Sequence, residues 1–242
     1  MMNLNCKKCN EPLLGNYCYN CGRPTTLKRI DRQYLIDEIA DFLLANRGMI
    51  YTIKKVLIKP GESVRDFISE DRYRFVKPVT FLIITSLIYT LVNHFFHIGI
   101  KDIVSNADEL EGYAAALFVN WIMENSGYWA LILGFFMAFW IRLFFRKAGY
   151  NLYEIFILLC FVNGITMLFS TVAAILQGIT HLKLIQTSGF IGIIYSIWAI
   201  GQFFDRKKAA SYIKALLSYI LVYFIISLLA AIATIIEIII KS

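Results

Sequence analysis

The chain has 242 residues, of which 58% are apolar and 17% are charged, and its formal net charge is +7. This composition is too apolar for a water-soluble domain of such a length and is typical of a membrane protein. Each spanning helix needs about 20 apolar residues, so the chain has room for several spans and one small polar module. A large catalytic domain outside the membrane is excluded.

Four of the five cysteines stand near the N-terminus in two C-x2-C pairs, Cys6 with Cys9 and Cys18 with Cys21. Each pair can turn two thiolates toward one tetrahedral ion, which is the pattern of a small zinc ribbon. We therefore predict a ribbon over residues 1–26 that holds one structural Zn²⁺. Four thiolates would close the coordination shell, and so short a module would fold only together with its metal.

The alternative use of these cysteines is a pair of disulfides, which would need an oxidising compartment. No apolar signal segment stands ahead of Cys6, and such a segment normally directs a chain out of the reducing cytoplasm. The spacing and the polar N-terminus together favour zinc. The fifth cysteine, Cys160, lies in an apolar stretch and is expected to be a buried packing residue.

Residues 27–78 interleave Lys and Arg with apolar residues and are predicted to form amphipathic helices at the membrane surface. One helix is expected to begin at Asp31, a second to end at Pro60-Gly61, and a third to span Glu62–Ser69. Whether they rest on lipid or on the spans stays open. The apolar faces expected for the three helices are Leu35, Ile39, Phe42 and Leu43; Ile50, Ile53 and Leu57; and Val64, Phe67 and Ile68.

The segment directly before the first span alternates the cations Arg72, Arg74 and Lys77 with bulky side chains. Three cations beside a charged leaflet are a candidate site for anionic lipid, at about 1 kcal/mol each. The alternative is a topology anchor next to residues of the aromatic belt. Nucleic-acid binding is not favoured, because a cluster of Lys and Arg alone is weak support for it.

Five spans are predicted over residues 79–242 from the length of the apolar stretches. The apolar segment Tyr113–Met123 is flanked by two glutamates and is expected to lie on the outer surface rather than to cross. The fold class is therefore an all-α integral membrane protein with a five-helix transmembrane bundle. The predicted spans are Val79–Ile98, Gly127–Phe145, Leu152–Leu176, Thr187–Phe204 and Ala215–Ile240.

The charges predict the orientation of the bundle. Of the 24 Lys and Arg residues, 21 fall before the first span or in the loops on the same side of the membrane. The other side holds only Lys101, Lys183 and Lys241. The positive-inside rule therefore places the N-terminus in the cytoplasm and the C-terminus outside. A reducing cytoplasm agrees with thiolate ligands for zinc.

Polar residues in the third span are candidates for a transmembrane role. Glu154 opens this span and is expected to pair with Arg142, Arg146 or Lys147 across a tight turn, because an isolated carboxylate at that depth is costly. A polar stripe of the same span must face protein or water, either as a packing surface or as a path. The stripe consists of Asn163, Thr166, Ser170 and Gln177.

Ser188, Gly192 and Ser196 form a stripe of small residues in the fourth span, which is typical of close helix packing.

The histidines His94, His97 and His181 fall on the predicted outer side, near an acidic loop. They are either a metal or pH-sensing site or solvated residues at span ends. The sequence contains no nucleophile elbow, phosphate-binding glycine loop or HExxH motif, so an enzyme is the less favoured interpretation.

The segments CKKCNEPLLGNYCYNCG, KPGESVRDFISEDRYRFVKPVTFLII and NLYEIFILLCF resemble a family of bacterial membrane proteins that is known only as a domain of unknown function. That resemblance implies an N-terminal zinc ribbon and a multi-span domain in a bacterial cytoplasmic (inner) membrane, and it implies no activity. The chain departs from the family at Glu70, Asp71 and Ile155, where relatives often have Gly, Lys and His. The five-span layout is also similar to Yip1-type trafficking proteins, in architecture alone.

These observations favour a non-enzymatic adaptor or membrane-organising protein that acts through its zinc ribbon. The expected partners are membrane lipids and either a second protein or another copy of the chain. One alternative is a small transporter or channel subunit that uses Glu154 and the polar stripe. A further alternative is a lipid-acting enzyme with chemistry at the outer histidines and carboxylates.

Overall fold

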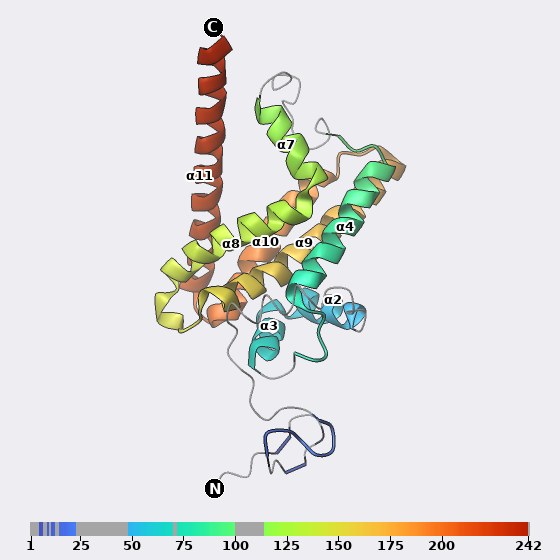
Figure 1. The fold of residues 1–242 in the computed structure, drawn as a ribbon, viewed down its shortest axis with the longest axis vertical. Coiled ribbons are helices and arrows are strands. Elements are labelled where there is room, and N and C mark those ends of the chain that lie inside the picture. The colour runs from blue at the N-terminus through green and yellow to red at the C-terminus, as the bar shows by residue number, and fades with distance from the viewer. Residues whose placement is uncertain are drawn as a thin grey trace.

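The structure is a computed structural model that describes residues 5, 6, 9, 11, 12, 15–22, 48–69, 72–99 and 114–241. The described part is all-helical and contains no strand (Figure 1). The helix predicted from Asp31 and most of the acidic loop after the first span lie outside the described residues. The elements in chain order are α2 (Met49–Ile58), α3 (Pro60–Ser69), α4 (Pro78–Phe95), α7 (Ala114–Glu124), α8 (Ser126–Phe144), the short 3-10 helix η2 (Arg146–Ala148), α9 (Leu152–Thr180), α10 (Ile185–Asp205) and α11 (Ala209–Lys241).

Five helices are long and apolar enough to cross a membrane, and they confirm the five predicted spans. They are α4, α8, α9, α10 and α11. Two of them extend beyond the predicted limits by four residues or more: α9 continues to Thr180, and α11 begins at Ala209 instead of Ala215. A helix ends where its backbone N–H and C=O groups no longer have partners one turn away. This point need not coincide with the end of the apolar stretch, so polar residues at these ends can stay helical.

The helix α7 has 11 residues, so it is about 16 Å long and too short to cross a bilayer. A single residue separates it from α8, and Figure 1 shows it beside the start of α8. It also contacts α11. The structure thus confirms a short separate helix where the sequence predicts one. Its depth in a membrane stays a prediction.

The central helix of the bundle is α9, which packs against α4, α8 and α10. Its buried stretch runs without interruption from Glu154 to Val162. The outermost span is α11, the least buried of the five. Gly164 of α9 lies so close to the Phe81 ring of α4 that no larger residue would fit without displacing that ring.

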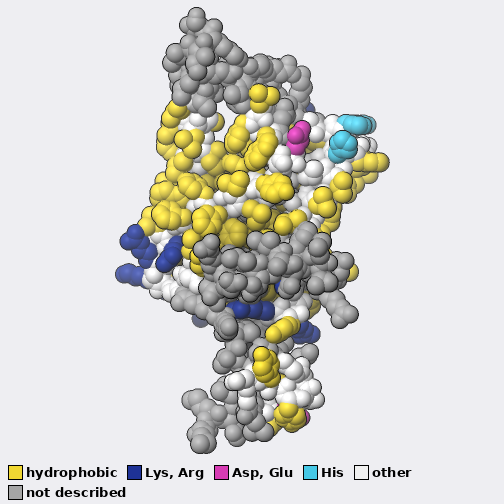
Figure 2. Space-filling model, viewed as in Figure 1, with side chains coloured by type: hydrophobic (Ala, Val, Ile, Leu, Met, Phe, Trp, Pro, Cys, Tyr) yellow, Lys and Arg dark blue, Asp and Glu magenta, His cyan; other side chains and the backbone are white. Residues whose placement is uncertain are grey.

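We call the end of the bundle where α4 and α9 begin and where α8 and α10 end the basic end. It carries Lys77, Arg146 and Arg206. Figure 2 shows Lys and Arg side chains gathered at this end, below a broad belt of apolar side chains. The histidines lie at the opposite end in the same view.

The helices α2 and α3 lie against the basic end of the bundle, and α3 packs on both α9 and α10. The Phe67 ring of α3 lies 5.3 Å from the Phe161 ring of α9, between centroids. Phe161 is also in contact with Phe75 and Phe81. One aromatic cluster therefore joins α3 to two spans, so these helices rest on the spans with at least one face.

The inward face of α3 agrees with the prediction, because Val64 and Phe67 are fully buried and Ile68 is half-buried. The predicted apolar face of α2 is wrong at two of its three positions, because Ile53 packs against the core but Ile50 and Leu57 are exposed. Ile50 is 83% exposed and Leu57 is 39% exposed, whereas the buried residues are Thr52 and Val56. Thr52 can be buried because its hydroxyl oxygen accepts a hydrogen bond from the N–H of Val76.

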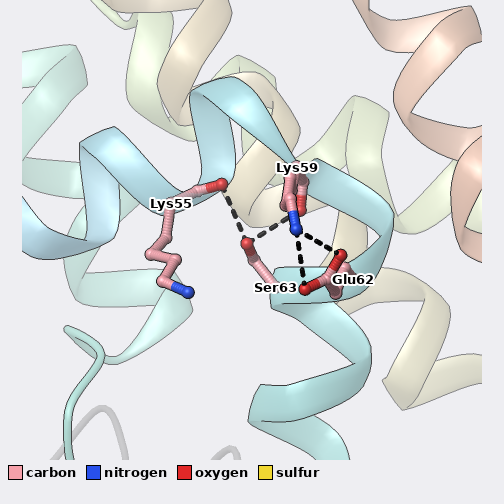
Figure 3. Close-up of polar contacts among 4 residues, drawn as sticks. All are labelled: Lys55, Lys59, Glu62 and Ser63. Carbon is pink, nitrogen blue, oxygen red and sulfur yellow. Dashed lines mark hydrogen bonds and ion pairs between the residues drawn. The ribbon is translucent and has the colours of Figure 1, made fainter.

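The corner between α2 and α3 is held by polar contacts of four residues (Figure 3). Proline has no N–H and favours the first position of a helix, so Pro60 starts α3 directly after Lys59. The Ser63 hydroxyl donates to two carbonyl oxygens at 2.8 Å, that of Lys55 in the last turn of α2 and that of Lys59 directly after it. An ion pair between Lys59 and Glu62, 3.1 Å long, lies on the outside of the corner.

We predict that Gly61→Ala weakens the packing of α3 on the bundle. A Cβ atom at this position would overlap with the backbone of Gln202 in α10, and overlap in a packed contact costs about 1–3 kcal/mol. The thermal unfolding midpoint in detergent should fall by several degrees.

The matched control is Gly189→Ala, also on a helix, where a Cβ atom meets nothing within 4 Å. This variant should unfold at or slightly above the wild-type midpoint, because alanine favours a helix over glycine. Equal midpoints for both variants would contradict the close approach of α3 and α10.

Candidate functional site

The four N-terminal cysteines converge on one point. Their sulfur atoms all lie within 4.8 Å of one another. The Sγ atoms of Cys6 and Cys21 are 3.5 Å apart, and so are those of Cys9 and Cys18. All four are free thiols. The predicted metal ligands are therefore brought together, and in the described residues they are the only group of three or more such ligands.

The local backbone explains how these residues converge. The N–H of Cys6 donates to the carbonyl of Glu11, which folds the first pair back on itself. The N–H of Gly22 donates to the carbonyl of Cys18, and Gly22 has a φ of +69°, which glycine adopts without strain. The N–H groups of Cys21 and Asn20 lower the pKa of the Cys18 thiol, because they stabilise its thiolate.

This arrangement fits a tetrahedral metal ion. With a metal–sulfur distance of about 2.3 Å, the sulfur atoms of a zinc thiolate site are about 3.8 Å apart, which lies between the shortest and the longest separations found here. Four thiolates leave no open coordination position for a water nucleophile. The centre is therefore suited to hold a small module together and not to hydrolyse a substrate.

We predict that the purified chain carries about one metal ion and loses it in the variant Cys18→Ser, because a tetrahedral thiolate site with three ligands binds metal weakly. Elemental analysis of protein in detergent would give both the amount and the identity of the metal. Acidification should also release the ion, since protonation competes with metal for the thiolates.

The matched control is Cys160→Ser. Cys160 is a free cysteine buried in α9, far from the cluster in sequence. Its replacement should leave the metal content unchanged. Retention of the metal by Cys18→Ser would contradict the four-cysteine centre.

A second candidate region is the contact between the pair α2–α3 and the end of α10. The Nη1 atom of Arg65 donates to the carbonyl oxygens of Gln202 and Phe203, at 2.6 and 2.7 Å. From the other side, the Tyr195 hydroxyl of α10 donates to the Val56 carbonyl at 2.8 Å. The two helices are thus fixed to α10 by hydrogen bonds from both directions.

Sequence reasoning missed the roles of Arg65 and Tyr195. The last carbonyl groups of a helix have no partner within that helix, and a guanidinium is the side chain best able to bind two of them at once. Arg65 stands between the buried residues Val64 and Phe67. A cation on the apolar side of an amphipathic helix indicates a contact with another element, and this feature of the sequence could have revealed the role of Arg65.

The predicted lipid-binding cations lie in the turn between α3 and α4. The Arg72 guanidinium donates to the carbonyl oxygens of Phe67 and Ile68, at 3.3 and 3.0 Å, and so closes the end of α3. Arg74 lies over the Tyr51 ring, with 5.3 Å from its guanidinium carbon to the centroid. Lys77 directly precedes α4. Lipid binding by these three residues stays a prediction.

We predict that Arg65→Gln loosens the end of α10. Each hydrogen bond from a charged donor contributes about 1.5–3 kcal/mol, and glutamine cannot replace two such bonds. The amides at the end of α10 should therefore exchange with deuterium faster, and the unfolding midpoint should fall. Lys54→Gln, an exposed change of the same charge on α2, is the control. Identical exchange in both variants would count against the role of Arg65.

Glu154 is buried, but the structure gives it a different partner from the predicted one. Its carboxylate accepts a hydrogen bond from the N–H of Asn151 at 2.7 Å, and the Asn151 side chain accepts one from the N–H of Glu154 at 2.8 Å. This is a capping box at the start of α9. Arg142, Arg146 and Lys147 form no ion pair within the described residues, so the expected pairing with Glu154 is wrong.

The polar stripe of α9 lies between helices. Asn163 approaches Gly134 of α8, and Thr166 lies next to Gly192 of α10. The hydroxyl groups of Ser170 and Ser188 are 3.4 Å apart. The Gln177 side chain accepts hydrogen bonds from the N–H groups of Leu184 and Ile185 at the start of α10. These contacts use the stripe for packing and for closing a helix end.

The histidines lie at helix ends away from the basic end. His97 and His181 follow α4 and α9 and have φ angles of 53° and 58°, in the left-handed region that ends helices. His94, His97 and Glu124 line a cavity of about 370 Å³. They do not converge as the cysteines do. His181 is not among the residues that line this cavity.

The family model described as "Protein of unknown function (DUF3667)" matches residues 46–90. This segment contains α2, α3 and most of α4, and is less than a fifth of the chain. The expected resemblance to an uncharacterised family is confirmed for this segment. No curated protein and no solved structure matches the chain.

Proposed function

We propose that the protein is a non-enzymatic adaptor or membrane-organising factor of the bacterial cytoplasmic membrane, which presents a zinc ribbon to a partner protein or to a second copy of itself. The observation that carries this proposal is the convergence of four thiols into a closed metal site. Such a site stabilises a small surface and offers no position for substrate. Zinc is the ion that best fits four thiolates in tetrahedral geometry.

Two aromatic side chains favour a binding role for this ribbon. Tyr17 is 67% exposed and Tyr19 is 69% exposed, on either side of the buried Cys18. Exposed tyrosines are enriched in protein interfaces, because they bury a large area at a small loss of side-chain entropy. A rigid metal-bound loop would hold these two rings in place for a partner.

The orientation belongs to the same proposal. The basic end of the bundle faces the cytoplasm, which places the zinc ribbon in a reducing compartment and the C-terminus outside. The support is the asymmetry of Lys and Arg between the two sides of the spans. The pair α2–α3 lies at that basic end and is fixed there by Arg65 and Tyr195.

A transporter or channel subunit is less well supported. Its path would use Glu154 and the polar stripe of α9, but Glu154 closes a capping box and the stripe is in contact with α8 and α10. A lipid-acting enzyme at the outer histidines is also less well supported. His94, His97 and Glu124 line one cavity, but among the described residues they form no ligand cluster of the kind that the cysteines form.

The test is site-specific photo-crosslinking in native membranes, with a photoreactive amino acid in place of Tyr17 or Tyr19 in the full chain. We expect one defined protein adduct, because both rings would lie in the interface. The same probe at Tyr128 of α8, which is 69% exposed at the other end of the bundle, should not give this adduct.

The role of the metal is tested by combining the probe with Cys18→Ser, which should abolish the adduct, and with Cys160→Ser, which should preserve it. Adducts that persist without the metal site, or that contain lipid only, would overturn the adaptor proposal.

A further inference from the structure

Two adjoining cavities lie at the basic end of the bundle, around the turn that connects α8 to α9. The first has a volume of about 450 Å³ and lies between the end of α8, η2 and the corner from α10 to α11. The second has a volume of about 600 Å³ and lies between α8 and the start of α9. They share Leu143 and Arg146 in their walls. Together they surround η2 on two sides.

The charge of these walls is strongly positive. The first cavity is lined by four cations, Arg146, Lys147, Lys208 and Lys214, and by a single carboxylate, Asp205. Asp205 is paired with Lys208 at 2.9 Å. The second cavity adds Arg142 and no acidic residue. Arg142, Arg146 and Lys147 form no ion pair within the described residues. The Glu154 carboxylate accepts the N–H of Asn151 in the second wall, but Glu154 is buried and lines neither cavity, so cations outnumber carboxylates in both walls.

Buried aromatic rings hold part of this wall in place. The Phe145 ring is stacked on the Phe204 ring at 3.8 Å between centroids, and this pair joins the end of α8 to the end of α10. Phe145 is buried. The Lys214 ammonium group of α11 lies 5.4 Å above the Phe145 ring, as a cation–π contact. The cations of three elements are therefore placed around one space before any ligand arrives.

The position of the cavities indicates which kind of anion would bind between these cations. Their polar walls lie at the ends of spanning helices, while Phe139 and Leu143 of the same walls belong to the apolar span α8. Phe139 is 54% exposed on this side of the helix. A ligand that joins an anionic group to a hydrocarbon chain would satisfy both parts of the wall. A free anion would leave the apolar part unused.

We propose that these two cavities bind the phosphate-bearing headgroup of an anionic membrane lipid. The guanidinium groups of Arg142 and Arg146 bind phosphate oxygens by two parallel hydrogen bonds, and Lys147 and Lys214 add charge. The glycerol and the first part of the acyl chains lie along Phe139 and Leu143. This site is separate from the cations Arg72, Arg74 and Lys77, which lie in the turn before α4.

The test measures lipid retention by native mass spectrometry of the full chain in detergent, with phosphatidylglycerol or phosphatidylcholine added at equal ratios. We expect the wild type to retain phosphatidylglycerol preferentially. The double variant R146Q/K214Q should retain about tenfold less of it, which corresponds to the loss of one good charge-assisted contact.

The matched control is K54Q/R206Q, which also removes one Lys and one Arg charge. Both positions are exposed, lie at the basic end and line neither cavity. It should retain phosphatidylglycerol like the wild type. Equal retention by the two double variants would show that only net charge matters and would overturn the site. Equal retention of both lipids by the wild type would also overturn it.

Two further measurements keep the outcome interpretable. R146K preserves the charge but not the bidentate geometry, and it should give an intermediate retention even if the double variant folds poorly. Millimolar inorganic phosphate distinguishes the two sources of the anion. Displacement of the lipid by phosphate alone would show a free-phosphate site and would contradict the lipid, whereas persistence of the lipid supports it.

Discussion

A membrane helix that ends at the surface must still satisfy its last carbonyl groups, and this requirement organises the basic end of the protein. At the end of α10, the carbonyls of Gln202 and Phe203 accept hydrogen bonds from Arg65 of α3. Gly61 lets the backbone of α3 approach α10 closely at the same place. The placement of α3 in turn puts Phe67 beside Phe161 of α9. One unsatisfied helix end thereby accounts for the position of α3.

The segment that matches the uncharacterised family ends within α4. It contains α3, with Gly61 and Arg65, but not α10. It also contains Thr52 and Arg72, whose hydrogen bonds shape the turn between α3 and α4. The matched residues 46–90 therefore consist of two helices that pack on the bundle and the first part of a span. The two candidate binding sites lie outside this segment. They are the four cysteines near the N-terminus and the cations around η2.

Long apolar stretches made the five spans predictable, because few other structures can satisfy the backbone in a bilayer. The metal site was predictable because two C-x2-C pairs have few uses besides tetrahedral coordination. The orientation of α2 was not, because Ile50 and Leu57 look at least as apolar as Thr52. Only the Val76 N–H, distant in sequence, explains why the threonine is the buried one. The partner of Glu154 was readable, since Asn151 and Glu154 have the spacing of a capping box.

The lengths of the spans have a mechanical consequence. The helix α4 has 18 residues and α11 has 33, so they are about 27 and 50 Å long, in a hydrocarbon layer that is about 30 Å thick. A straight helix such as α11 either tilts or extends into the headgroups on the side away from the basic end. Its neighbours bury less of it than of any other span, so contacts with protein restrict the tilt of α11 less than the tilt of the other four. When the bilayer becomes thinner or thicker, we therefore expect the tilt of α11 to change before the tilt of the other four spans.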